Sequence, residues 1–352
     1  MENFASAVPT TIRVLTQTAP RQISWRERPA PILTAPDQAI VRPLAVARCD
    51  LDRPIATGRI PLTGSFELGH EAVAEVVAVG EAVQGVAVGD LVVVPFQISC
   101  GHCPSCLAGR TASCESVPAL AAYGLAPYSG HEWGGALADA LLVPFADAML
   151  VKLPGGVAPW IAAAAADNVT DGWRAVAGPL QERPGEGVLV VGGGAPSIGL
   201  YAVAAAHSVG AGAVTYVDDA PERLAIAEAL GATVVAARPR PDLLDSRFAV
   251  TVDASAHPDG LRLAIEATAV EGTCTSVSVY TADMPLPLFA MYTRGIRFVT
   301  ARANVRALLP DVLARIGTAA LPVERIVTSR VSWADAPEAW LAPATKLVIT
   351  RD

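Results

Sequence analysis

The chain has 352 residues, a length that favours about two domains. Hydrophobic residues make up 52% of the sequence and charged residues 17%, so a large core is available and disorder of the whole chain is excluded. The formal net charge of −8 argues against a nucleic-acid partner, because such partners select basic surfaces.

The predicted elements change in kind part-way along the chain. Short strands separated by turns are expected first, at Ala39–Leu44, Glu75–Val79 and Leu91–Val94. From about Trp160, strands alternate with helices: strands at Gly187–Val191, Ala213–Val217, Phe248–Asp253 and Thr273–Val279, helices at Ile198–Ser208, Pro221–Leu230 and Pro258–Ala269. This alternation predicts an α/β fold with a parallel sheet covered by helices on both faces. A helix near Val305–Ile316 and a strand near Lys346–Thr350 follow.

One apolar segment has the length of a membrane span. Residues 187–217 contain no Asp, Glu, Lys or Arg. Glycine and proline recur within the segment, so a strand, a turn, a buried helix and a second strand explain it better than a membrane helix. Met1–Gln22 has no basic start followed by an apolar run, so no signal peptide is expected. We therefore expect a cytoplasmic protein with no membrane partner.

Four cysteines lie close together in the first half of the chain. Cys100, Cys103, Cys106 and Cys114 are separated by two, two and seven residues. Four thiolates on one short segment can close a tetrahedral site around zinc, and an iron–sulfur cluster is the alternative that the spacing leaves open. A site with four protein ligands has no open position, so we expect a structural zinc that takes no part in chemistry.

A glycine-rich turn between the strand at Val188–Val191 and the next helix predicts a dinucleotide site. Gly192 and Gly194 permit a tight turn and let the backbone approach a pyrophosphate at the helix N-terminus. Gly199 follows Gly194 by five residues, where the usual motif has three. Asp218 directly follows the second strand, where a carboxylate accepts from the adenosine ribose and repels a 2′-phosphate, so NAD is favoured over NADP. Arg223 can reach the same ribose or remain a solvated helix charge.

Three further residues are ambiguous when taken singly. Cys49 follows an apolar strand and can be a small core residue. His70 lies in a Gly-His-Glu sequence, and Asp167 ends an apolar run, where an unpaired carboxylate would be costly. A cysteine, a histidine and one more oxygen or sulfur ligand would leave an open position on a zinc ion.

Taken together, these motifs resemble the zinc-dependent medium-chain dehydrogenase/reductases, the alcohol dehydrogenase superfamily, over nearly the whole chain. The resemblance rests on an ordered set of motifs: Cys49, Gly69-His70-Glu71, Gly89-Asp90, the four-cysteine lobe, Gly134-Gly135-Ala136, Asp167 with Gly172-Trp173, and the glycine turn with Asp218.

The resemblance implies two domains and a second zinc. A β-rich GroES-like catalytic domain would span residues 1–158 and 292–352, and a Rossmann-type domain residues 159–291. The catalytic zinc would be held by Cys49, His70 and, where the third ligand is acidic, Asp167. Glu71 resembles a glutamate that can exchange onto the metal, and Phe96 and Trp173 resemble residues of the substrate pocket. The implied activity is hydride transfer between NAD(H) and an alcohol or carbonyl compound, with two zinc ions per chain.

Three positions depart from the family pattern. Leu51 stands where many members carry a proton-relaying Ser or Thr, and Pro54 stands at the next relay position; neither side chain carries a proton. Asp171 replaces a threonine near the nicotinamide and is a candidate proton carrier. Reduction of an iminium or activated C=C bond, and a non-catalytic dinucleotide-binding role, are therefore alternatives. We expect a small-molecule substrate, which the sequence does not identify, and a homodimer or homotetramer.

Overall fold

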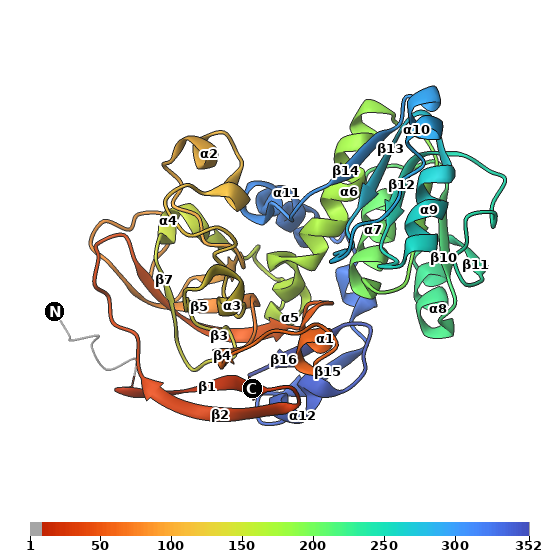
Figure 1. The fold of residues 1–352 in the computed structure, drawn as a ribbon. Helices are drawn as coiled ribbons and strands as arrows, with labels where there is room; N and C mark the ends of the chain where they lie inside the picture. The colour runs from red at the N-terminus through yellow and green to blue at the C-terminus, as the bar shows by residue number, and fades with distance from the viewer. Residues whose placement is uncertain (1–8, 352) are drawn as a thin grey trace. The chain divides into compact units, whose positions relative to one another are not determined.

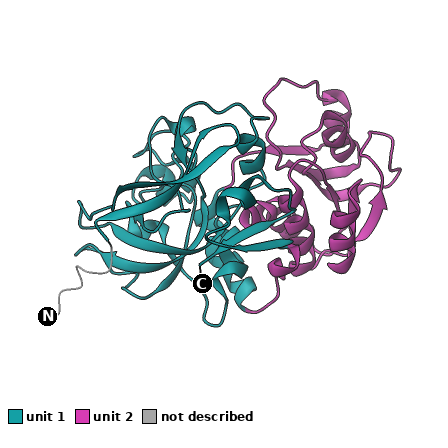
Figure 2. Ribbon diagram, turned by 90° about the horizontal axis from the view of Figure 1, so that it is seen from below, with its two compact units in different colours: residues 1–167, 304–317, 327–352 teal, residues 168–303, 318–326 magenta. Residues whose placement is uncertain are grey.

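The computed structural model describes residues 9–351, which form two compact units (Figures 1 and 2). Among these residues, unit 1 consists of the chain up to Asp167, Asn304–Gly317 and the chain from Val327 onward. Unit 2 consists of Asn168–Ala303 and Thr318–Ile326. The predicted α/β class, with one β-rich unit and one Rossmann-type unit, is confirmed.

Unit 1 is built around a largely antiparallel sheet of seven strands. The order is β15-β16-β3-β5-β6-β8, and β7 also pairs with β3. The strands are β3 (Ala39–Ala47), β5 (Glu71–Val79), β6 (Leu91–Val94), β7 (Leu141–Val143), β8 (Val151–Lys152), β15 (Ser329–Ser332) and β16 (Leu347–Thr350). Their inward side chains form an apolar core that includes Val46, Val94 and Ile349. Because β16 pairs with β3, the end of the chain completes the sheet that begins near its start.

A second sheet of unit 1 was not predicted from the sequence. Strands β1 (Thr11–Ala19) and β2 (Gln22–Pro29) form a hairpin, and β4 (Phe66–Glu67) pairs with β1 (Figure 1). The hairpin turns at Arg21, which has a left-handed φ of 64°. Pro20 suits the first central position of a turn, but Arg21 stands at the second, where a positive φ favours glycine or asparagine, so the sequence gives only half of the turn signal.

Unit 2 has a parallel sheet of six strands in the order β11-β10-β9-β12-β13-β14. The strands are β9 (Val188–Val191), β10 (Val214–Asp218), β11 (Thr233–Ala236), β12 (Phe248–Asp253), β13 (Thr268–Ser276) and β14 (Arg297–Thr300). The helices of this unit include α6 (Asn168–Glu182), α7 (Pro196–Ser208), α8 (Pro221–Ala229), α9 (Pro258–Glu266) and α10 (Leu288–Arg294). The strand order reverses direction between β9 and β12, the position where open α/β sheets bind ligands.

Several predicted boundaries move in the structure. β5 begins at Glu71 instead of Glu75, and the helix expected to reach Ala269 ends at Glu266 because β13 starts at Thr268. The division between the units falls after Asp167 and Ala303 instead of after residues 158 and 291. The first shift arises because α5 (Pro159–Ala162) and the 3₁₀ turn η3 (Ala163–Ala166) pack on β3 and β5. The second arises because β14 pairs with β13.

The apolar segment 187–217 forms β9, α7 and most of β10. Between residues 9 and 351, no helix is both long enough and apolar enough to cross a bilayer.

Candidate functional site

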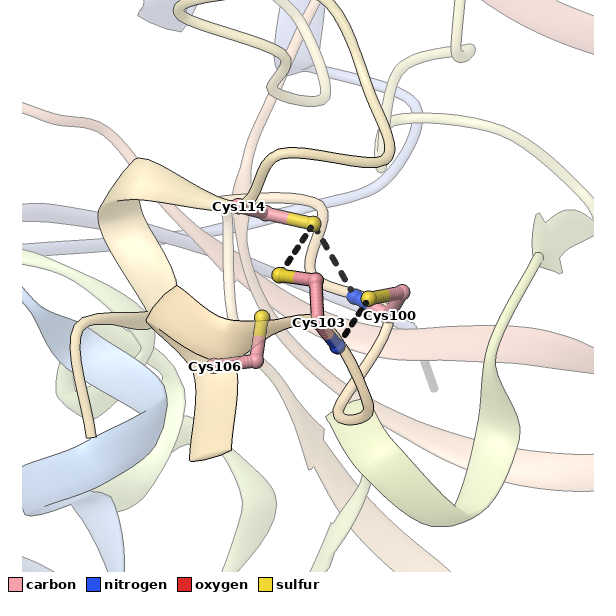
Figure 3. A group of neighbouring side chains, drawn as sticks. All are labelled: Cys100, Cys103, Cys106 and Cys114. Atoms are coloured by element: carbon pink, nitrogen blue, oxygen red, sulfur yellow. Dashed lines mark hydrogen bonds between the residues drawn. The ribbon is translucent and has the colours of Figure 1, made fainter. Parts of the chain in front are cut away.

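The four-cysteine lobe gathers its thiols at one point of unit 1 (Figure 3). Cys103 caps the short helix α2 (Pro104–Leu107), which carries Cys106, and Cys114 ends the 3₁₀ turn η2 (Thr111–Ser113). The four Sγ atoms all lie within 4.8 Å of one another, and all four cysteines are free of disulfide bonds. Sulfurs bound tetrahedrally to one zinc are about 3.8 Å apart, from a Zn–S bond of about 2.3 Å. The lobe therefore has the donors and the compactness of a structural zinc site.

Backbone groups support this arrangement of sulfurs. The N–H groups of Cys100, Cys103 and Glu115 donate to the sulfurs of Cys114, Cys100 and Cys103 at 3.4, 3.3 and 3.4 Å. The bond from Glu115 is the main reason that the pKa of the Cys103 thiol is lowered. Such bonds favour the thiolate form, which is the form that binds metal, whereas burial raises the pKa of Cys106 and Cys114.

A second group of donors lies deeper in unit 1. Cys49 follows β3, His70 and Glu71 lie at the start of β5, and Asp167 caps the end of η3. One ligand atom from each residue lies within 4.8 Å of the others, and all four residues are buried. Segments far apart in the sequence thus bring together a sulfur, a nitrogen and carboxylate oxygens, the donor types that zinc accepts.

The buried ionisable side chains of this second group favour a bound cation. Burial raises the pKa of Cys49 well above its usual value, and the neighbouring Asp167 raises it further. Burial also raises the pKa of Glu71 to about 8, although Lys346 opposes the shift. Both ring nitrogens of His70 are buried and make no hydrogen bond within the described part of the chain, although Nε2 lies 3.4 Å from Oδ2 of Asp167. Burial lowers the pKa of His70, but the carboxylates of Asp52 and Asp167 outweigh it and raise the pKa to about 9. A divalent cation would satisfy the imidazole and stabilise the anionic forms of its neighbours, so the residues fit a metal.

Two charged residues that the sequence analysis did not select surround this group. Asp52 accepts a hydrogen bond from the Cys49 N–H at 2.8 Å, and its Oδ1 lies 3.7 Å from Nδ1 of His70. Lys346 pairs with Glu71. Asp52 is only three residues from Cys49, so its closeness in sequence to a candidate ligand could have predicted its place at the site. Lys346 is distant in sequence, and only the pairing of β16 with β3 brings it to the site.

The glycine turn of unit 2 is shaped by close backbone approaches. The N–H of Gly194 donates to the Ser255 carbonyl at 2.7 Å, and a Cβ at Gly194 would lie 2.6 Å from that of Ala256. A Cβ at Gly199 would lie 3.0 Å from the Ala254 Cβ, so α7 packs tightly on the loop after β12. The Gly194 N–H is thus used inside the protein, and the predicted place of this glycine at a bound pyrophosphate stays a prediction.

The carboxylate of Asp218, at the end of β10, is held by three residues. Oδ2 accepts from the Tyr216 hydroxyl at 2.7 Å and from Nε of Arg223 at 2.7 Å. Oδ1 accepts from Nη2 of Arg223 at 2.5 Å and from the Ala220 N–H at 3.0 Å. A Cβ at Gly192 would lie 2.4 Å from both the Tyr216 hydroxyl oxygen and Oδ2 of Asp218, so only glycine leaves room for this contact. Burial opposes ionisation, yet these partners lower the pKa of Asp218.

Comparisons with known proteins agree with this combination of sites. Residues 35–155 match the family described as alcohol dehydrogenase GroES-like domain, and residues 197–317 match the family described as zinc-binding dehydrogenase. A protein of Mycobacterium tuberculosis named as a probable zinc-binding alcohol dehydrogenase is 33% identical over 86% of this chain and 77% of its own length. The chain belongs to the zinc-binding alcohol dehydrogenase family of medium-chain dehydrogenase/reductases.

Two further relatives extend the comparison. The solved structure of an alcohol dehydrogenase from Thermus sp. ATN1 superposes with a TM-score of 0.86 at 32% identity, covering 97% of this chain and 100% of that chain. A glutathione-independent formaldehyde dehydrogenase of Pseudomonas aeruginosa is 37% identical over 54% of this chain and 49% of its own length. Membership in this family makes the chain an alcohol dehydrogenase-like oxidoreductase, and the family implies zinc and a nicotinamide dinucleotide.

The remaining predicted site residues of this family member fall in both units. Phe96 lies beside His70, with ring centroids 5.5 Å apart, so the predicted pocket residue contacts a candidate ligand. Leu51 is half-buried and packs against the apolar core of unit 1. Trp173 and Asp171 are buried on α6 of unit 2, and Asp171 forms an ion pair with Arg174 one turn later. Asp171 is thus engaged within its own helix, and its role as a proton carrier stays a prediction.

Proposed function

We propose that this chain transfers a hydride between NAD(H) and an alcohol or carbonyl compound, and that it binds two zinc ions. The observation that carries the proposal is the convergence of Cys49, His70 and Asp167, with Glu71, on one buried point. A binding module has no need of such a group, because four donors of three chemical types in an apolar interior are costly without a metal. Names of relatives, which include an alcohol and a formaldehyde dehydrogenase, support the substrate class.

The assignment of ligands follows the donor chemistry. Cys49, His70 and Asp167 would hold the reactive zinc, with Glu71 as an alternative ligand, and the four lobe cysteines would hold the structural zinc. When bound, the reactive zinc would supply a Lewis acid for the substrate oxygen, and the nicotinamide would supply or accept the hydride.

The chain's own residues orient this site and limit access to it. Asp52 holds the backbone of Cys49 and faces the His70 ring, which keeps both ligands in position. The Phe96 ring lies against the imidazole and gives the site an apolar wall. Leu51 offers no hydroxyl, so the substrate proton would leave through a route other than the usual side-chain relay.

The preference for NAD rests on Asp218. Its carboxylate already accepts four hydrogen bonds within the chain, so it can accept from a ribose hydroxyl and repel a 2′-phosphate once Arg223 releases one of its oxygens. Arg223 neutralises part of the Asp218 charge. The preference for NAD therefore depends on whether the Arg223 guanidinium remains paired with the carboxylate when the cofactor binds.

Leu51 also favours a second candidate function. A side chain that cannot carry protons suits the reduction of an iminium or activated C=C bond, where the substrate needs no relayed hydroxyl proton. Asp171, the candidate replacement proton carrier, forms an ion pair with Arg174.

We also propose that the protein is a homodimer or homotetramer. In the described chain, β14 is an outer strand of the unit 2 sheet and pairs only with β13. Leu288, Phe289 and Tyr292 on α10 expose 66%, 80% and 83% of their surface. An open strand edge in the same unit as large exposed apolar side chains is typical of a protein interface.

Metal analysis and a substrate screen test the proposal together. We expect about two zinc ions per chain and NADH formation with NAD⁺ and secondary alcohols, polyols or amino alcohols. NADH consumption by iminium or enone compounds, without alcohol oxidation, would establish the second function instead. About one zinc per chain, retained in a Cys49→Ser variant, would refute the reactive metal site.

A further inference from the structure

A cavity of about 390 Å³ lies in unit 1, and none of its lining residues belongs to either group of candidate metal ligands. Its wall is formed chiefly by three arginines and two tryptophans: Arg13, Arg42, Arg351, Trp25 and Trp333. They come from β1, β2, β3, the loop after β15 and the residue after β16. Its volume falls within the range of about 300–1,000 Å³ that small-molecule sites occupy.

The aromatic part of the wall is flat and ordered. Trp25 and Trp333 are stacked, with ring centroids 5.9 Å apart and ring planes at 27°. The guanidinium carbon of Arg13 lies 5.6 Å from the Trp25 ring centroid, and that of Arg351 lies 3.9 Å from the Trp333 ring centroid. Cation–π contacts of this kind hold the guanidinium groups beside the indole faces.

The charged part of the wall has more cations than anions. Asp139 pairs with Arg13 and Arg351, and Glu75 pairs with Arg42, so two carboxylates face three guanidinium groups. Burial lowers the pKa of Arg351, and the positive charges of Arg13 and Arg42 lower it further. This excess of positive charge occurs in a protein with a net charge of −8. An anion in the cavity would relieve the repulsion between the arginines.

The three arginines differ in how firmly they are fixed. Arg351 donates to the carbonyls of Pro43 and Ala138, both at 2.7 Å, and forms a fixed part of the wall. The side chains of Arg13 and Arg42 are 56% and 53% exposed, so their guanidinium groups can turn toward a ligand. Nε1 of Trp333 is buried and has no hydrogen-bond partner among the described residues.

We propose that this cavity, the arginine–tryptophan pocket, binds a small organic anion that has a flat ring and a phosphate or carboxylate group. Arginine forks match the geometry of both anions. Trp333 is covered by Trp25 and Arg351, so the ring would lie on the outer face of Trp25, where only the exposed Arg13 side chain has to turn aside. Bound there, the anion would connect the β1–β2 hairpin to β3 and to the end of β16. We therefore expect it to stabilise unit 1 without contacting either group of metal ligands.

Nitrogen-15 labelling of tryptophan gives a local readout, because the chain has only 6 tryptophans. Phenyl phosphate and benzoate are the probes, with inorganic phosphate as the anion without a ring and benzamide as the ring without charge. We expect phenyl phosphate or benzoate to shift the indole resonances of Trp25 and Trp333, assigned from single Trp→Phe variants. Of these two probes, the one that binds more tightly shows whether the ligand carries a phosphate or a carboxylate group. Calorimetry gives the affinities, and a His70→Ala variant shows whether binding occurs away from the reactive metal site.

Variants of the exposed arginines decide the outcome. Arg13→Gln/Arg42→Gln should weaken binding about tenfold or more, whereas Arg26→Gln on the same hairpin should leave it within about twofold. Arg42→Gln alone provides a milder change if the double variant loses its folded spectrum. The proposal is overturned if the Trp25 and Trp333 resonances do not move, or if binding survives the double variant. Inorganic phosphate or benzamide binding as tightly as the ring-bearing anions would also overturn it.

Discussion

The Nζ atom of Lys346 lies 2.6 Å from Oε2 of Glu71, and neither side chain is exposed to solvent. The same Nζ donates to the Arg48 carbonyl at 2.9 Å. Burial alone would lower the pKa of Lys346, but Glu71, together with Asp50 and Cys49, raises it overall. This ion pair places a lysine charge next to the candidate zinc ligands. Glu71 begins β5, whereas Lys346 directly precedes β16 near the other end of the sequence.

Removing the Lys346 charge should therefore lower the free energy of unfolding more than removing a surface charge would. Lys346→Met leaves Glu71 buried without its partner, and we expect a loss of about 3–5 kcal/mol in the free energy of unfolding. Urea denaturation measures this loss. Adding Glu71→Gln removes the stranded charge and should restore part of the stability. A double variant as unstable as Lys346→Met would show that the ion pair is not the cause.

The two groups of metal ligands should respond differently to loss of one thiol. Cys106→Ser opens the lobe, and we expect loss of one zinc, a lower melting temperature and greater sensitivity to chelators. Cys49→Ser should lose the other zinc and abolish turnover while the lobe zinc is kept. Zinc content, melting temperature and rate, measured on both variants, separate the two sites. Equal loss of turnover and of zinc in both variants would argue against distinct roles.

Leu51 provides a test of the proton route. A hydroxyl at this position can pass a proton toward solvent, so Leu51→Ser should raise the rate of alcohol oxidation at low pH, where hydroxide is scarce. Leu51→Ala is the matched control, because it makes the same room without a hydroxyl. The ratio of the two rates across a pH series is the measurement. A ratio that does not change with pH would mean that proton transfer is not limiting or runs elsewhere.

Asp218 provides a test of cofactor choice. Asp218→Ser removes the carboxylate and releases Arg223, so NADH should bind about tenfold or more weakly and NADPH more tightly. Fluorescence titration of both cofactors measures the change. Asp219→Ser is the control, since the Asp219 side chain is 61% exposed. Equal effects of the two substitutions on the binding of both cofactors would show that Asp218 does not determine cofactor specificity.

Local motifs were the part of this molecule that could be predicted from sequence. The lobe cysteines share one short segment, and the strand–helix alternation of unit 2 follows from apolar periodicity. The β1–β2 hairpin was missed because its turn at Arg21 carries no glycine signal. Lys346 and Tyr216 were missed for another reason: their roles depend on strand pairing and on the space left by Gly192, and neither is visible in a linear pattern.

Assembly is the last property that the exposed surface of unit 2 makes testable. Phe289 and Tyr292 on α10 are large and almost fully exposed, so a charge there should disfavour burial in an interface. We expect Phe289→Arg/Tyr292→Arg to shift the protein toward the monomer in size-exclusion chromatography with light scattering. Ile32→Arg is the control, because Ile32 is 70% exposed but lies in unit 1.

The outcome also bears on stability. An interface that covers apolar side chains stabilises the folded chain by mass action, so the melting temperature of the parent protein should rise with protein concentration. In the Phe289→Arg/Tyr292→Arg variant this dependence should disappear, while zinc content stays unchanged. A variant that keeps both the parent mass and the concentration dependence would place the interface elsewhere on the molecule.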